Sequence, residues 1–261
     1  MSSWAGAVRR WHARCSHVDK FGKHAFWESL YARGKAPKEW FLSAELAAAS
    51  VASAFGAHKG KQCAGSLGNF CKILHLGCGT SALGSALVSA MTNELHLSAH
   101  VMNTDYSPAA VEAAAKTHNG QQQQTFRVWD AAGVESPPSL PPSNGGPSSH
   151  YDLLVDKGTL DALAFASDDM LVKYLSTLRQ CLLLRSPEHM PPPLLVHFTD
   201  DPPEVRGELL AAAFPAKEGE GWRVTWSAAD QEGGVGGEEW QYYRYTVHAS
   251  RGSAVIDDSQ Y

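Results

Sequence analysis

The sequence lacks the cysteine and histidine patterns that hold metal ions in proteins. Its five cysteines form no C-x-x-C pair, and its twelve histidines include no H-E-x-x-H spacing. We therefore expect reduced thiols and no metal site.

The chain also lacks an excess of basic residues and any long apolar run. Its formal net charge is −5, whereas a general binder of nucleic acid or of a membrane surface needs positive charge to meet phosphates. No apolar stretch approaches the roughly 18 residues of a membrane-spanning helix. We expect neither a nucleic acid nor a membrane as partner. The length of 261 residues suits one large α/β domain.

The most informative feature that is present is a glycine turn. The apolar residues 72–76 end in Gly77-Cys78-Gly79, and a run of small residues over 82–90 reads as a helix. Glycine permits a sharp turn and a close approach of ligand to backbone. A helix N-terminus adds free N–H groups and a partial positive charge. The turn fits an adenosine that carries a carboxylate, and it also fits a dinucleotide.

Two acids follow the next two predicted strands. Asp105 ends a strand over 99–104, and Asp130 ends a strand over 124–129. Because the carboxyl ends of parallel strands line one crevice, Asp105 can accept from ribose hydroxyls and Asp130 from an adenine amino group. Either acid alone would be an ordinary turn residue. Together with the glycine turn they favour an adenosine site.

The order of the remaining elements helps to decide between an adenosine that carries a carboxylate and a dinucleotide. Further strands are predicted over 151–155 and 194–198, and helices over 43–58, 107–117 and 168–184. Strands that alternate with helices predict a parallel sheet with helices on both faces. The last two strands, Trp222–Trp226 and Gln241–His248, have only a glycine-rich stretch near their connection, so we expect an antiparallel hairpin. A dinucleotide dehydrogenase would need a second half-site for the nicotinamide and a proton-transfer residue beside it, and no Tyr-x-x-x-Lys pair follows the glycine turn.

The N-terminus has a composition of its own. Residues 1–23 carry five basic residues against one acid, with Trp4, Val8, Trp11 and Cys15 at helical spacing. A basic amphipathic start resembles a mitochondrial transit peptide, and the alternative is a short helix packed on the domain. We divide the chain into a basic segment, 1–24, and one domain, 25–261. The compartment is then cytoplasmic or mitochondrial.

Three segments resemble class I (seven-strand) methyltransferases: 75–81, 103–108 and 151–162. The string Asp156-Lys157-Gly158-Thr159-Leu160-Asp161-Ala162 is typical of the protein lysine methyltransferase branch that acts on citrate synthase or elongation factor 1-alpha. The stretches 26–41, 198–206, 221–224 and 242–247 resemble the same branch, so the likeness covers about residues 21–249. It implies a Rossmann-like class I methyltransferase fold, with a seven-stranded, mostly parallel sheet and an antiparallel terminal hairpin.

The resemblance implies S-adenosyl-L-methionine as cofactor and a protein lysine as acceptor. It places the methionine part of the cofactor against Gly77, Cys78 and Gly79. The ribose would lie on Asp105 with Tyr106 along the adenosine, and the adenine edge on Asp130 and Ala131. Lys157 would lie near the cofactor's carboxylate side, and Trp27, Tyr31 and Trp40 would cover the cofactor. Without the resemblance, the aromatics would be read as core and Lys157 as a solvated residue. Most class I enzymes carry an acid at the position of His75.

The chemistry asks little of the protein beyond alignment of donor and acceptor and exclusion of water. A lysine must lose a proton before it attacks. Asp156 or Asp161 could guide its ammonium inward, and no general base is assigned. The alternatives are a small-molecule methyltransferase of the same fold and a catalytically silent binding module.

Overall fold

The computed structural model describes most of the chain, in eight ranges. These are 20–60, 70–118, 121–133, 135–140, 150–183, 192–216, 221–229 and 241–250. Most of the basic segment 1–24, the glycine-rich stretch 233–237 and part of the loop predicted over 131–149 lie outside the described residues. Among the described residues, no helix has both the length and the apolar character needed to cross a bilayer.

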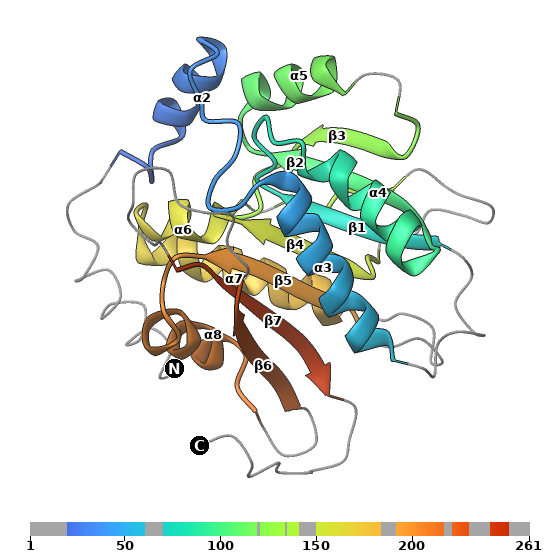
Figure 1. Ribbon diagram of the computed structural model, residues 1–261. Coiled ribbons are helices and arrows are strands. Elements are labelled where there is room, and N and C mark those ends of the chain that lie inside the picture. The colour runs from blue at the N-terminus through green and yellow to red at the C-terminus, as the bar shows by residue number, and fades with distance from the viewer. Residues whose placement is uncertain are drawn as a thin grey trace.

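A seven-stranded sheet forms the centre of the molecule (Figure 1). Its order is β3-β2-β1-β4-β5-β7-β6. β1 to β5 run parallel, whereas β7 pairs antiparallel with both β5 and β6. The strands are Phe70–Leu76, Ser98–Asp105, Gln124–Val128, Leu153–Lys157, Leu194–Thr199, Gly221–Ala228 and Tyr243–Ser250, numbered in chain order. The predicted fold class, including the antiparallel terminal hairpin, is confirmed.

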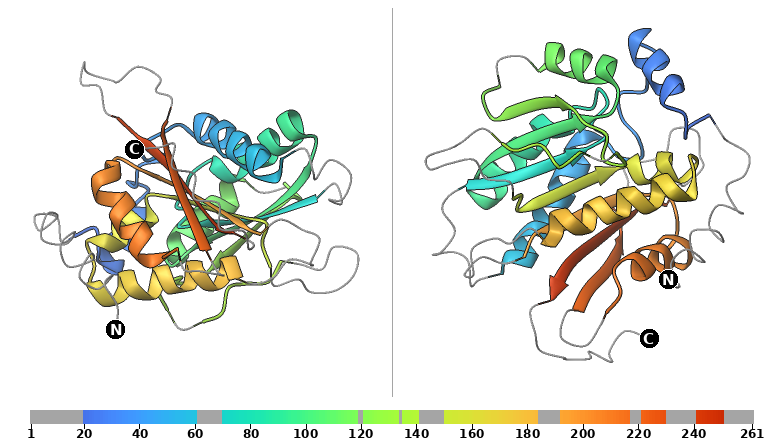
Figure 2. Two further views of the ribbon diagram at one scale, coloured as in Figure 1. Left: turned by 90° about the horizontal axis from the view of Figure 1, so that it is seen from below. Right: turned by 180° about the vertical axis from the view of Figure 1, so that it is seen from behind.

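Helices cover both faces of the sheet. The residues of α3 (Ala44–Lys59) and α4 (Leu83–Leu95) pack with one face of β1, β4 and β5. The residues of α7 (Asp168–Leu183) and α8 (Glu208–Ala213) pack against the other face, which Figure 2 shows from behind. α5 (Pro108–Thr117) contacts β2 and β3, and α2 (His24–Ala32) contacts α5.

Two helices begin where capping residues predict. The Ser43 side chain accepts a hydrogen bond from the Leu46 N–H at the start of α3. The Ser107 side chain accepts from the Ala110 N–H, and Pro108 takes the first position of α5. Serine satisfies a free N–H group there, and proline has none to leave unpaired.

Some elements differ from the prediction. β4 begins at Leu153 and ends at Lys157, two residues later than expected, so Lys157 belongs to the strand. α6 (Thr159–Ala164), the π-helical turn Pro203–Gly207 and α8 were not predicted, because five or six residues carry too little periodicity. Within the predicted surface loop, Leu140 is buried in the core.

Candidate active site

A cavity of about 310 Å³ lies at the carboxyl ends of the parallel strands. Its walls come from the turns after β1, β2, β3 and β4, from residues 200–201 after β5, and from residues 21–41 ahead of the sheet. All eleven residues predicted to contact the cofactor line it: Trp27, Tyr31, Trp40, Gly77, Cys78, Gly79, Asp105, Tyr106, Asp130, Ala131 and Lys157.

The glycine turn is held in left-handed backbone conformations that favour glycine. Gly77 has φ +60° and Gly79 has φ +50°. A Cβ on Gly79 would lie 2.6 Å from the Tyr31 hydroxyl, so the α2 side chain lies directly against bare backbone. The Cys78 N–H donates to the Thr104 carbonyl at 2.8 Å, which joins the turn to the end of β2.

Asp105 connects the glycine turn to the start of α5. Its Oδ2 accepts from the Gly79 N–H and its Oδ1 from the Ser107 N–H, both at 2.9 Å. The side chain is buried, and this burial raises its pKa to about 6 despite the two hydrogen bonds, which lower it. Burial and then the Asp105 carboxylate raise the pKa of neighbouring Tyr106.

Asp130 and Ala131 form the wall after β3. Asp130 Oδ1 accepts from the Ala132 N–H at 2.9 Å, and the Asp130 carbonyl accepts from the Gly133 N–H at 3.0 Å. The carboxylate therefore shapes a tight turn as well as lining the cavity. The turn role is therefore observed, and the ligand role of Asp130 stays a prediction.

Lys157 is fully engaged by the protein itself. Its ammonium donates to Glu39 Oε2 at 2.5 Å, to the Trp40 carbonyl at 3.0 Å and to the Leu42 carbonyl at 3.2 Å. These three bonds use all the donors of an ammonium group. Burial lowers its pKa, and the Glu39 carboxylate opposes that shift. Lys157 thus ties residues 39–42 to β4, in addition to lining the cavity.

Glu39 does not line the cavity but contacts residues that do, and the sequence analysis missed this role. Its carboxylate also accepts from the Ser81 hydroxyl at 2.8 Å and from the Ala82 N–H at 2.9 Å, immediately before α4. A carboxylate is favoured there because a helix N-terminus has free N–H groups and partial positive charge. The only sequence signal was its place beside Trp40 in a family-like stretch.

The aromatic cover is a packed cluster of rings. Trp27 stacks on Tyr31 with centroids 6.1 Å apart, and it meets Trp40 edge-on at 5.7 Å. Phe21, which was not predicted, lies against Trp27 and Phe165 and accepts through its carbonyl from Trp27 Nε1 at 2.6 Å. These contacts join α2, the 39–42 segment and the end of α6 over the cavity.

His75 lies on β1, where most class I enzymes carry an acid. It is buried, and its Nδ1 lies 2.9 Å from Asn103 Oδ1. Burial lowers its pKa to about 4, so the imidazole is neutral at pH 7. It therefore offers no negative charge to the cavity that it lines.

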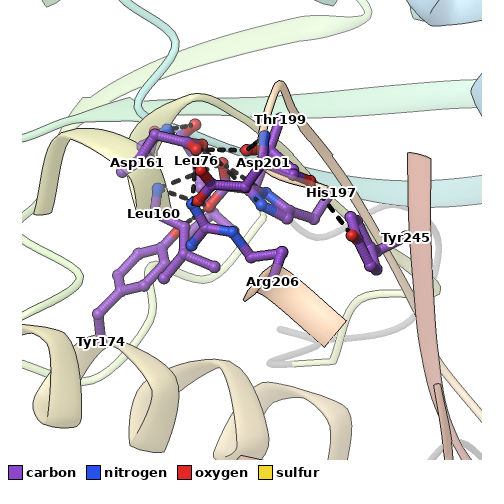
Figure 3. A network of polar contacts seen from close by, with 11 residues as sticks. Leu76, Leu160, Asp161, Tyr174, His197, Thr199, Asp201, Arg206 and Tyr245 are labelled. Carbon is purple, nitrogen blue, oxygen red and sulfur yellow. Dashed lines mark hydrogen bonds and ion pairs between the residues drawn. The ribbon is translucent and has the colours of Figure 1, made fainter. Parts of the chain in front are cut away.

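The two acids expected to guide an ammonium differ in placement. Asp156 is fully buried, and its carboxylate accepts from the Thr159 and Leu160 N–H groups and from the Tyr174 hydroxyl. It therefore anchors the start of α6, and a guiding role for Asp156 is wrong. Asp161 does line the cavity, and Figure 3 shows it within a polar network.

The chain is similar in sequence to a known protein family. Residues 74–183 match the family model described as a methyltransferase domain. With the order of the seven strands, this match places residues 74–183 in a methyltransferase domain of class I, the class whose cofactor is S-adenosyl-L-methionine.

The curated relatives include mitochondrial citrate synthase-lysine N-methyltransferases. The human protein is 27% identical over 191 residues, which cover 69% of this chain and 68% of the relative. The protein of Danio rerio is 26% identical over 211 residues, which cover 76% of each. Among solved structures, a TehB-like methyltransferase from Corynebacterium glutamicum is 18% identical and covers 86% of this chain and 94% of its own, with a TM-score of 0.48.

Proposed function

We propose that this chain is a protein lysine N-methyltransferase that uses S-adenosyl-L-methionine, with citrate synthase as the first acceptor to test. The observation that carries the proposal is that one cavity joins two kinds of wall. Acids suited to adenosine, Asp105 and Asp130, lie on one side, and the carboxylate of Asp161 lies on another. The human and Danio rerio relatives act on citrate synthase by name, which supports that choice over elongation factor 1-alpha.

The cavity residues fit an adenosine-bearing cofactor. Asp105 has the acceptor oxygens that two ribose hydroxyls require, and Tyr106 would lie along the adenosine. Asp130 and Ala131 would meet the adenine edge. The absence of Cβ atoms at Gly77 and Gly79 leaves backbone open to the methionine part. Trp27, Tyr31 and Trp40 would cover the ligand.

Lys157 supports this arrangement indirectly. Its bonds to Glu39, Trp40 and Leu42 hold the covering segment in place. It can reach the cofactor's carboxylate side only by exchanging one of these partners. We therefore propose that Lys157 orders the cover and borders the cofactor's carboxylate.

The protein's contribution to methyl transfer is alignment and exclusion of water. When bound, S-adenosyl-L-methionine supplies an electrophilic methyl group to the lysine nitrogen. Asp161 would attract the incoming ammonium, and the aromatic cover would keep water from the site. The proton leaves the ammonium before attack, and no side chain of the described residues is assigned as its base.

A reconstituted reaction tests the proposal. Purified chain is incubated with labelled S-adenosylmethionine and either citrate synthase or elongation factor 1-alpha, and labelled residues are located by mass spectrometry. We expect methyl groups on a citrate synthase lysine and none with Asp105→Ala. Label found only on a metabolite or on RNA would contradict a protein substrate. Binding of S-adenosylhomocysteine without transfer to any acceptor would favour a silent binding module.

The compartment is part of the same proposal. The relatives are named mitochondrial, and the N-terminal segment 1–24 has transit-like composition. A fluorescent fusion of residues 1–25 should enter mitochondria. Diffuse cytosolic fluorescence would instead favour elongation factor 1-alpha as acceptor.

A further inference from the structure

Arg206 is a fully buried cation beneath the acceptor side of the cavity. It lies in the π-helical turn Pro203–Gly207 that follows β5. Its Nη2 is 2.6 Å from Asp161 Oδ1 and 2.6 Å from Asp201 Oδ2 (Figure 3). A buried guanidinium is costly unless carboxylates meet it, so these two contacts define its position.

The two carboxylates that Arg206 holds both belong to the cavity wall. Asp161 comes from α6 and Asp201 from the loop after β5, and both line the cavity whereas Arg206 does not. The Thr199 hydroxyl donates to Asp161 Oδ1 at 2.5 Å and accepts from the Asp201 N–H at 3.0 Å. The cavity acids are therefore held from behind by groups that face away from the ligand space.

His197 joins this network to the start of α6. Its Nδ1 is 3.3 Å from Asp156 Oδ1, and its Nε2 is 3.9 Å from Asp161 Oδ2. Asp156 in turn accepts from the first N–H groups of α6. The orientation of α6, and hence of Asp161, is fixed at both its start and its side.

The network leaves negative charge on the cavity wall. Arg206 brings one fixed positive charge, whereas three carboxylates line the cavity at this wall, those of Asp161, Asp200 and Asp201. Burial raises the pKa of Asp161, and the Arg206 charge opposes that shift. Arg206 thus helps to keep Asp161 ionised without cancelling the surplus.

We propose that Arg206 is a positioning residue for methyl transfer, which acts through Asp161 and Asp201 by holding their carboxylates where a cationic acceptor amine enters the cavity. This inference rests on the proposed function, because it takes a lysine ammonium as the acceptor. It also assigns a role to the stretch 198–206, which in the sequence is marked only by its resemblance to the lysine methyltransferase branch.

The test compares Arg206→Met with Arg206→Lys, and Arg223→Met on β6 is the matched control. Arg223 is exposed and lies outside the network. For each protein, S-adenosylhomocysteine affinity is measured by calorimetry, and kcat and KM are measured for methylation of citrate synthase. We expect Arg206→Met to raise the acceptor KM roughly 10- to 100-fold, while cofactor affinity stays within about threefold. Arg206→Lys keeps a positive charge between Asp161 and Asp201, so its acceptor KM should rise less than that of Arg206→Met.

A second variant keeps the test decisive if Arg206→Met does not fold. Asp161→Asn preserves shape and should raise the acceptor KM in the same direction with cofactor affinity retained. An unchanged acceptor KM in a folded Arg206 or Asp161 variant overturns the inference, and so does a parallel loss of cofactor affinity. Failure of the proposed function is separately visible, because the wild-type chain would then bind S-adenosylhomocysteine and methylate no protein lysine.

Discussion

Gly77 and Thr159 are packed so closely that no side chain fits between them. A Cβ on Gly77 would lie 1.8 Å from Thr159 Oγ1, which donates to the Leu76 carbonyl at 3.0 Å. The glycine turn after β1 and the start of α6 after β4 are therefore in direct contact. This contact fixes two walls of the cavity relative to each other.

Gly77→Ala should destabilise the protein strongly. The left-handed φ costs a non-glycine residue about 1–2 kcal/mol, and Thr159 must also move and lose its bond to Leu76. Gly34→Ala is the matched control, because Gly34 has φ +62° but nothing within 4 Å of its Cβ position. Urea unfolding should show a clearly larger loss for Gly77→Ala. Equal losses would mean that the Thr159 contact carries no energy.

Cofactor binding should depend on pH through Asp105. Its pKa is raised from 3.8 to about 6, and ribose hydroxyls need the ionised carboxylate as acceptor. S-adenosylhomocysteine affinity should therefore rise by up to about tenfold per pH unit below 6 and level off above 7. Calorimetry at pH 5 to 8 measures this. Asp105→Asn should bind weakly at every pH, and a persisting slope in that variant would assign the titration to another group.

The same group affects the stability of the ligand-free protein in the opposite direction. Between pH 3.8 and about 6 the folded state binds more protons at Asp105 than the unfolded chain does. Its stabilising contribution is thus complete below the unfolded value and is lost as the pH rises through about 6. In urea unfolding, the free energy of unfolding of the wild type should therefore fall relative to that of Asp105→Asn as the pH rises from 3.8 to about 6.

Lys157→Met should cost about 2–4 kcal/mol of stability, because it removes the buried cation that Glu39 and two backbone carbonyls contact. Lys173→Met is the control. Lys173 forms an exposed helical pair with Asp169, which is worth less than about 0.5 kcal/mol. Thermal or urea unfolding gives both values. Similar losses in the two variants would contradict the role of Lys157 as an anchor.

Glu28→Ala should weaken cofactor binding more than it weakens the fold. Glu28 on α2 accepts from the Ser107 hydroxyl and, at 3.4 Å, from the Ala109 N–H, so it holds the covering helix on α5. We expect S-adenosylhomocysteine affinity to fall by roughly 3- to 10-fold, equivalent to about 1 kcal/mol. Glu112→Ala, at an exposed position on α5, should bind normally. Unchanged S-adenosylhomocysteine affinity in Glu28→Ala would contradict a role of α2 in covering the cofactor.

Local sequence signals predicted much of the fold and part of the site. Ser43, Ser107 and Pro108 mark helix starts because capping is decided within four residues. The glycine turn and Asp105 could be paired in advance because parallel strands bring their carboxyl ends together. These features need no knowledge of distant contacts.

The remainder depends on contacts between distant residues. Glu39 and Lys157 are 118 residues apart, and nothing near either of them marks the partner. Arg206 reads as an ordinary charged residue until the turn after β5 places it beneath Asp161, 45 residues earlier. Short elements such as α6 escape periodicity because they complete fewer than two turns.

The link between Glu39 and Lys157 also has a consequence for the order of folding. Residues 39–42 leave the ribosome well before β4, yet their partners are the ammonium on β4 and the start of α4. Loop closure over such a separation is slow compared with local helix formation. We therefore expect residues 39–42 to dock only once β4 and the start of α4 are in place.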